Sequence, residues 1–185
     1  MKELGGKPLI AHVLDRVAHL GNEWIVVVAS ETQRHQLPHA VRQRAEVVVD
    51  NYSDHSPLVG ALTGFESAKS ELALLLPCDA ALVSVEIASL LLDLCVDRNA
   101  VVPRWPDGKI EPLQAAYNVR SAANAAEVAL KEGKRDMLGM ISHLRGIRYV
   151  STLVLQQYDP RLITFLNINT VQDLKKAEHA LQRTK

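Results

Sequence analysis

The sequence predicts an α/β fold in which a mostly parallel β-sheet is covered by helices on both faces. Short, fully apolar and largely β-branched runs recur along the chain, which is typical of strands buried between helices. Stretches with apolar residues at three- and four-residue spacing separate them, and this alternation of strand and helix favours parallel pairing. The expected strands of the first half are residues 24–29, 47–49, 72–76 and 100–102.

The expected helices of the first half lie between these runs. One begins near Pro8, which suits a first helical turn, and ends at Gly21. The others are residues 33–43, 58–69 and 85–96. The Gly5-Gly6 pair precedes the first helix without a strand before it, so we interpret it as a turn and not as a phosphate-binding loop.

The second half predicts a less regular pattern. A strand is expected over residues 111–118, followed by helices at 122–132 and 135–144, which glycines terminate. Strands at 148–153 and 163–166 and a final helix from Val171 complete the chain. Thr170 and Asp173 have the spacing of a capping box for that last helix.

Composition limits the classes of function. The 185 residues, 48% of them hydrophobic, suit a single domain. Lys and Arg number 21 and Asp and Glu also number 21, so no net charge favours nucleic acid or a membrane, and we expect a small-molecule partner. Cys78 and Cys95 form no metal or disulfide pattern, which suits the cytoplasm. No apolar run approaches the roughly 20 residues of a membrane-spanning helix.

Asp79 is the first candidate for chemistry because it follows the apolar run LLLPC, where ligands gather in open α/β sheets. It is either a loop aspartate that caps Ala80 or Ala81 or a ligand of Mg²⁺, which prefers carboxylate oxygen. The adjacent Cys78 is interpreted as a small buried filler and not as a nucleophile, since no histidine is near in sequence.

Two further groups follow other strands. Asp50 ends the run 47–49, and Pro57 and Leu58 begin the next helix, whose free backbone amides could face a base or a phosphate. Asn167 and Asn169 alternate just before the last helix, so a strand would place them on the same face. Helix capping accounts for one asparagine but not for both.

Taken in order, these segments resemble one enzyme family. An acid-ended strand before a proline-led helix, then LLLPCD, EPLQAAY, GKRDM and FLNINTVQDL, is similar to the molybdenum cofactor guanylyltransferases, also called molybdopterin-guanine dinucleotide synthases. The resemblance covers essentially all 185 residues. It implies a three-layer α/β/α Rossmann-like nucleotidyltransferase fold with a mostly parallel sheet, in one domain with a nucleotide-binding half (1–105) and an acceptor-binding half (106–185).

The resemblance also implies roles for particular residues. Asp79 would be the catalytic residue that holds Mg²⁺ on the nucleotide phosphates, with Asn169 as a second metal ligand. Asp50, Pro57 and Leu58 would bind the nucleotide, with Asp50 beside the guanine. The implied acceptor-binding residues, which receive the molybdopterin, are Glu111, Pro112, Arg135, Asn167 and Asn169.

The implied reaction joins GMP from GTP to the phosphate of molybdopterin and releases pyrophosphate. Alignment of the phosphates and neutralisation of their charge by Mg²⁺ and cationic side chains would carry the catalysis. The implied partners are GTP and molybdopterin, without nucleic acid or membrane. A homo-oligomer, paired through the segment from Glu111 onward, and contact with molybdoenzyme maturation proteins stay open.

The sequence departs from the family in one large feature. A first strand followed by a loop of the type LAGGxSxRMGxxK is expected immediately before residue 1, and without it we expect little or no catalysis and a gap at the centre of the sheet. We therefore expect the gene product to start upstream of Met1. Ser56, and Ala80 to Leu82, also differ from the residues usual in the family. The alternatives are a cytidylyl- or sugar-phosphate nucleotidyltransferase and a non-catalytic remnant that binds a nucleotide or a partner.

Overall fold

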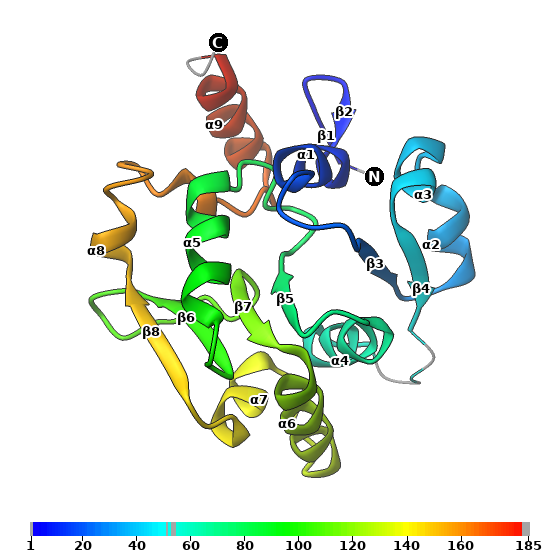
Figure 1. The fold of residues 1–185 in the computed structure, drawn as a ribbon. Coiled ribbons are helices and arrows are strands. Elements are labelled where there is room, and N and C mark those ends of the chain that lie inside the picture. Colours follow the sequence, from blue (N-terminus) through cyan, green and yellow to red (C-terminus); the bar gives the residue numbers. More distant parts are fainter. Residues whose placement is uncertain (1, 51, 53–54, 183–185) are drawn as a thin grey trace.

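The computed structural model describes residues 2–50, 52 and 55–182 of the chain. It is an α/β fold in which helices cover both faces of a sheet (Figure 1). The sheet strands lie in the spatial order β4, β3, β5, β7, β6, β8, with a break between β3 and β5. Their bounds are β3 (Ile25–Val28), β4 (Glu46–Val49), β5 (Leu72–Leu75), β6 (Ala100–Arg104), β7 (Ala115–Asn118) and β8 (Ile147–Ser151).

The chain starts with a small hairpin that the sequence did not predict. Strands β1 (Glu3–Leu4) and β2 (Lys7–Pro8) pair antiparallel, and Gly5 and Gly6 form the turn between them. Both glycines have positive φ, 58° and 77°, as this tight hairpin turn requires. The predicted turn is therefore confirmed. Helix α1 (Leu9–Val17) follows directly after Pro8.

Strands β3 and β4 form a parallel pair in which each valine of β3 lies beside one of β4. The connection between them contains α2 (Glu31–Gln36) and α3 (His39–Arg44), where the sequence predicted one helix. Pro38 divides them because a proline forces the preceding residue out of the helical region, and Leu37 has ψ 138°. Strands β3 and β4 together form the smaller of the two fragments into which the sheet is divided.

The larger fragment is mixed. Strand β7 runs antiparallel to its neighbours β5 and β6, and β6 is parallel to β8. The predicted strand over 111–118 begins only at Ala115, because residues 111–114 form a turn. The predicted strand at 163–166 is wrong: Ile163–Phe165 is a 3₁₀-helix, η1. Strand β8 ends at Ser151, after which α8 (Thr152–Leu155) begins.

Alternating residues of this fragment face two helical layers. Val102 and Tyr117 pack in one apolar core with α4 (Pro57–Ser67), α6 (Val119–Lys131) and α7 (Met137–His143). Val101 and Ala116 face the opposite core, which α5 (Val85–Cys95) closes. The last helix, α9 (Val171–Gln182), packs beside the N-terminal hairpin. Three layers, helix–sheet–helix, are the predicted architecture. In the described part of the chain, no helix is long and apolar enough to cross a membrane.

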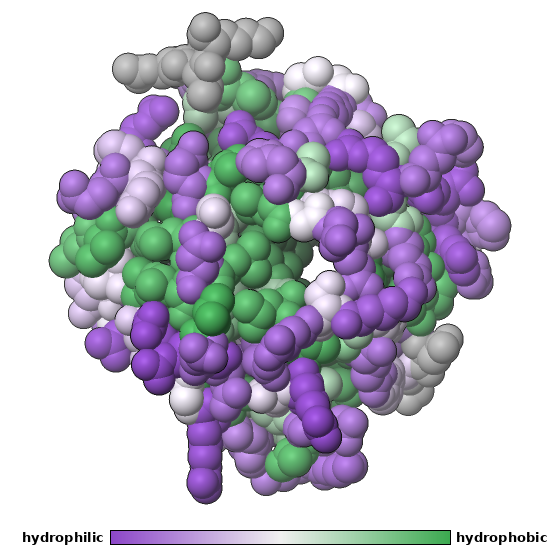
Figure 2. Space-filling view, viewed as in Figure 1, coloured by the Kyte–Doolittle hydropathy of each residue, from purple (hydrophilic) through white to green (hydrophobic). Residues whose placement is uncertain are grey.

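The sheet is interrupted between β3 and β5. The edges of β3 and β5 face each other without pairing, and α1 and α4 close the space from the two sides (Figure 1). We call this space the slot; its walls include Val13, Val17, Ile25–Val27, Gly60, Gly64 and Leu72–Leu76. In space-filling view an opening is visible at the centre of the molecule, with apolar atoms along one side (Figure 2).

The slot is large enough to matter for stability. Its volume is about 410 Å³ and it is open to solvent, so the apolar side chains on its walls lack the packing contacts that they would have inside a continuous core.

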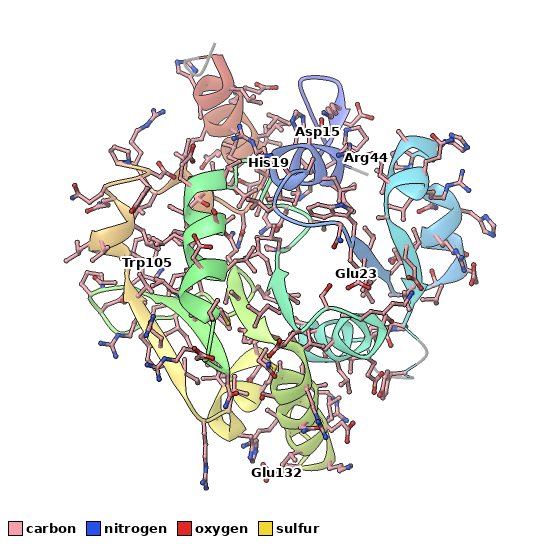
Figure 3. The ribbon with its side chains drawn as sticks, viewed as in Figure 1. Asp15, His19, Glu23, Arg44, Trp105 and Glu132 are labelled. Atoms are coloured by element: carbon pink, nitrogen blue, oxygen red, sulfur yellow. The ribbon has the colours of Figure 1, made fainter. Side chains whose placement is uncertain are left out.

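Glu23 ties the two sheet fragments together across the slot. Its carboxylate, just before β3, accepts hydrogen bonds from the backbone amides of Lys69 and Ser70 and from the Ser70 hydroxyl, just before β5. The side chain lies at the rim of the opening (Figure 3). Because the amino ends of β3 and β5 meet at this carboxylate, the two strands run in the same direction.

We predict that Glu23→Gln lowers the melting temperature by roughly 2–4 °C at pH 7, equivalent to about 1 kcal/mol for a chain of this size. The Ser70 hydroxyl, and then the backbone amides, lower the pKa of Glu23 from its ordinary value of 4.5. The stabilisation is therefore complete above that value and is lost as the pH falls through the folded-state pKa. Thermal denaturation from pH 3 to 7 tests this.

The control is Glu31→Gln, which removes an exposed carboxylate paired only with Arg34 on the same helix. This variant should melt close to the parent at every pH. Equal melting of the Glu23 variant and the parent at pH 7 would show that the carboxylate does not hold the fragments together.

Candidate functional site

The carboxyl end of β5 presents Asp79 on a short turn. Pro77 ends the strand region, and the Ala80 amide donates to the Pro77 carbonyl, which turns the chain toward α5. The Asp79 side chain is half-buried, and among the described residues its carboxylate has no hydrogen-bond partner. It therefore does not cap Ala80 or Ala81, and both of its oxygens are available to a ligand.

A backbone contact brings the asparagines to Asp79. The Ile168 amide donates to the Asp79 carbonyl over 3.2 Å, and Ile168 is buried between Asn167 and Asn169, which are both exposed. These three positions are far apart in sequence and meet through this one hydrogen bond. Two predicted metal ligands, Asp79 and Asn169, thus lie on adjacent segments.

Hydrogen bonds at the start of α9 fix the segment that contains Asn169. The Thr170 hydroxyl accepts from the Asp173 amide, and the Asp173 carboxylate accepts from the amides of Thr170 and Asn169. The predicted capping box is therefore present, with Asp in place of Glu. The Thr170 hydroxyl, donating to the same carboxylate, is the main cause of the lowered pKa of Asp173. The cap holds the Asn169 backbone in place beside Asp79.

Lys2 is a cation of this site that sequence reasoning missed. Its ammonium group donates to the carbonyl oxygens of Asn169 over 2.6 Å and Ile168 over 3.3 Å. It also lies near enough to Cys78 to favour the thiolate electrostatically. A single lysine near the start of a chain has no distinguishing pattern, so no signal in the sequence could have identified it.

Cys78 is held as a neutral thiol. Loss of solvation raises its pKa most, and the neighbouring Asp79 charge raises it further, while Lys2 opposes both. A raised pKa removes the thiolate that nucleophilic catalysis needs. Cys78 is exposed, so the prediction that it is a buried filler is wrong, but its raised pKa agrees with the prediction that it is not a nucleophile. Its side chain lines the slot.

Asp50 lies at the carboxyl end of β4, on the other side of the slot from Asp79. The two are separated by β3 and the slot. Unlike Asp79, Asp50 is buried, and its oxygens accept from the Tyr52 amide and lie 3.4 Å from His55 Nδ1. Both contacts are with residues shortly before α4.

The helix after Asp50 begins as predicted, with Pro57 in its first turn. The Ser56 hydroxyl accepts from the Val59 amide and so satisfies one of the free donors of the helix terminus. Pro57 is exposed, whereas the Leu58 side chain is fully buried in the core. Only the backbone of Leu58 could therefore contact a nucleotide.

The remaining predicted acceptor residues have partners of their own. Glu111 accepts from the Trp105 indole and pairs with Lys109, and the Pro112 carbonyl accepts from the buried Tyr117 hydroxyl. The Arg135 guanidinium donates to the carbonyl oxygens of Leu130, in the last turn of α6, and of Lys134, just after the helix. The turn between α6 and α7 lies opposite α9, as the labelled Glu132 of that turn shows (Figure 3). The fold therefore does not bring Arg135 to Asp79.

The oxygen atoms available at Asp79 and Asn169 are suitable ligands for a hard cation. A carboxylate and an amide oxygen are ligands that Mg²⁺ accepts, and Mg²⁺ commonly takes one or two protein ligands together with substrate phosphates. Among the described residues, no group of three or more histidine, cysteine or acidic side chains could hold a metal alone. A metal here would need oxygens from the substrate.

Curated relatives of the chain are molybdenum cofactor guanylyltransferases. The chain is 28% identical over 177 residues to a probable molybdenum cofactor guanylyltransferase of Methanosarcina mazei, covering 94% of this chain and 79% of the relative. It is 28% identical over 180 residues to the molybdenum cofactor guanylyltransferase of Desulfosudis oleivorans, covering 97% and 85% of the two chains.

Solved structures show the same fold. The crystal structure of molybdopterin-guanine dinucleotide biosynthesis protein A from Archaeoglobus fulgidus has a TM-score of 0.81 and 28% identity, covering 98% of this chain and 89% of that one. The 2-C-methyl-D-erythritol 4-phosphate cytidylyltransferase from Thermus thermophilus has a TM-score of 0.72 at 19% identity, covering 98% and 92%. It shares the fold alone. The model of the MobA-like NTP transferase domain matches residues 1–146, so the chain belongs to that family.

Proposed function

We propose that this protein is a molybdenum cofactor guanylyltransferase that transfers GMP from GTP to molybdopterin and releases pyrophosphate. One observation carries the chemistry: the Asp79 carboxylate has no hydrogen-bond partner among the described residues, and a backbone hydrogen bond holds Asp79 beside Asn167 and Asn169. The names of the relatives supply the substrates. An acceptor phosphate oxygen attacks the α-phosphorus of GTP, and the bond to the β-phosphate breaks with its electrons leaving on pyrophosphate.

The residues around Asp79 would have separate roles in binding the metal, the nucleotide and the acceptor. Asp79 and Asn169 would hold Mg²⁺, which when bound offsets the charge of the triphosphate. Lys2 adds a cation on the same side, next to Asn169. Asp50, across the slot, would face the guanine. Pro57 and the backbone amide of Leu58 would contact the nucleotide. Asn167, Glu111, Pro112 and Arg135 stay predicted contacts of the acceptor, and of these Asn167 lies beside Asp79.

The direct test is nucleotide binding by this chain. We expect GTP with Mg²⁺ to raise the melting temperature more than CTP or ATP, and EDTA to remove most of the shift. Ligand at 100 times its dissociation constant stabilises by about 2.7 kcal/mol, equivalent to several degrees. A larger shift with CTP would indicate a cytidylyltransferase, and the absence of any shift would reject nucleotide binding by these residues.

We predict that Asp79→Asn weakens Mg²⁺-dependent GTP binding at least about tenfold, equivalent to about 1.4 kcal/mol. The substitution removes the negative charge without changing the volume, and no hydrogen bond of the described residues depends on that carboxylate. Isothermal titration of GTP with and without Mg²⁺ measures the effect. The melting temperature without ligand should be unchanged.

The matched control is Asp97→Asn. Asp97 is exposed just after α5, at the opposite end of that helix from the Asp79 turn, and its positive φ of 59° is one that Asn adopts equally well. This variant should bind GTP as the parent does. If both variants weaken binding equally, Asp79 has no specific role at the metal.

A further prediction concerns Thr170, which positions Asn169 through the helix cap. Thr170→Ala should cost about 1 kcal/mol of stability, because it removes the side-chain cap of α9. It should also reduce Mg²⁺-dependent GTP binding, since the Asn169 backbone is then less restrained. Thr170→Ser keeps the hydroxyl and should restore both the melting temperature and the binding. A stability loss without any change in binding would limit the cap to a structural role.

A further inference from the structure

A groove lies between α9 and the segment that leads from α8 through η1. Its volume is about 680 Å³, and it is open to solvent. We call it the α9 groove. Its described lining contains none of the residues predicted to bind the metal, the nucleotide or the acceptor, although Leu166 in its wall directly precedes Asn167. The α9 groove is therefore a second concave surface, next to the candidate site but formed by other side chains.

Apolar side chains form one wall of the α9 groove. Trp105, just after β6, packs edge-on against Phe165 with 5.7 Å between the ring centroids. Both rings are half-buried, so part of each stays accessible, and Leu162 and Ile163 extend the wall. The Trp105 indole nitrogen already donates to Glu111 over 2.7 Å. The indole therefore offers apolar surface to a ligand and needs no hydrogen bond from it.

Hydrogen bonds fix the backbone of this wall. The Asp159 carboxylate accepts from the Thr164 amide over 2.8 Å, and the Thr164 hydroxyl accepts from the Ser84 amide at the start of α5. Between Asp159 and Thr164, Leu162 has φ 49°, a left-handed conformation that is uncommon for leucine and persists only where surrounding contacts determine it. The wall is therefore formed before a ligand arrives, which lowers the entropic cost of binding.

The rim of the α9 groove is cationic. Four exposed basic side chains line it, and no acidic side chain is among its described lining residues; the four are Arg161, Lys175, Lys176 and His179. Within the described part of the chain, none of the four makes a side-chain hydrogen bond or an ion pair, although Lys176 helps to lower the pKa of Asp173. Basic and acidic residues balance in the whole chain, at 21 each, so this positive charge is a local feature.

Charge and shape together select the occupant. An apolar wall bordered by cations is complementary to a ligand that carries anionic groups around an apolar one. A small molecule binds tightly by burying most of its surface, which a groove open to solvent does not allow. A peptide segment can instead place one apolar side chain beside Trp105 while its carboxylates pair with the rim. Basic clusters recognise acidic motifs in this way.

We propose that the α9 groove binds an acidic peptide segment of a partner protein, with one large apolar side chain of that segment packed against Trp105. Tryptophan and arginine carry much of the binding energy of protein interfaces, and Trp105 and Arg161 are the lining residues of those types. The proposal concerns a surface outside the candidate site and holds whatever nucleotide that site takes.

The test is binding of a synthetic peptide to the 185-residue chain without nucleotide. The probe is a fluorescein-labelled peptide with three acidic residues on each side of one phenylalanine, followed by fluorescence anisotropy. We expect saturable binding of one peptide per chain. Replacing the phenylalanine by glycine, or every acid by glutamine, should weaken binding at least about tenfold. Raising the salt from about 0.05 to about 0.5 M should also weaken it, because salt screens exposed charges.

Two charge reversals locate the binding surface. Lys175→Glu changes an exposed side chain of the rim and should weaken peptide binding at least about tenfold. The matched control is Arg120→Glu, at an exposed position of α6, which lies at the opposite end of the molecule from α9 (Figure 1). This variant should bind the peptide as the parent does. Trp105→Leu should weaken binding of the phenylalanine peptide more than that of the glycine peptide, which tests the apolar contact.

Five outcomes would overturn the proposal. Three are the absence of saturable binding, equal binding of the glutamine peptide, and unchanged binding by Lys175→Glu. An equal loss in Arg120→Glu, or equally tight binding of a single-stranded RNA, would reveal only a general attraction between opposite charges. Displacement of the peptide by a pterin phosphate would assign the α9 groove to the acceptor of the proposed reaction and not to a partner protein.

Discussion

The constraint on which the rest of the structure depends is the break in the sheet between β3 and β5. A continuous sheet carries its rigidity through backbone hydrogen bonds, but here those bonds stop on both sides of the slot. The two fragments are connected by α1 and α4, which pack across the slot, and by the Glu23 carboxylate at its amino end. Side-chain packing and one exposed carboxylate therefore connect the two fragments, whereas backbone hydrogen bonds connect neighbouring strands elsewhere in the sheet.

The same break divides the candidate site. Asp79 and the asparagines belong to the larger fragment, where the Ile168 amide holds them together. Asp50 and the start of α4 lie across the slot, beyond β3. Any ligand that reaches from Asp79 to Asp50 must therefore bridge the two fragments. If a nucleotide binds as proposed, its binding and the integrity of the sheet would be coupled for this geometric reason, since a ligand that contacts both fragments restrains their separation.

The two acids show why similar sequence signals can have different meanings. Asp50 and Asp79 each end an apolar run, and the sequence treats them alike. The structure separates them by their partners: the Asp50 oxygens are engaged by Tyr52 and His55, whereas the Asp79 carboxylate has no partner among the described residues. A carboxylate without a partner is the one that can take a metal or a donor without first losing a hydrogen bond.

By itself the sequence determined the architecture, because apolar runs and their spacing report local burial. Strands β3 to β8, the α/β alternation, the glycine turn and the Thr170–Asp173 cap all follow from residues close in the chain. Only the tertiary structure placed Asp79 beside Asn169, added Lys2, moved Arg135 away from them and showed the strand at 163–166 to be a 3₁₀-helix. Those outcomes depend on contacts between distant segments, and above all on two strand edges left facing each other, which no local pattern encodes.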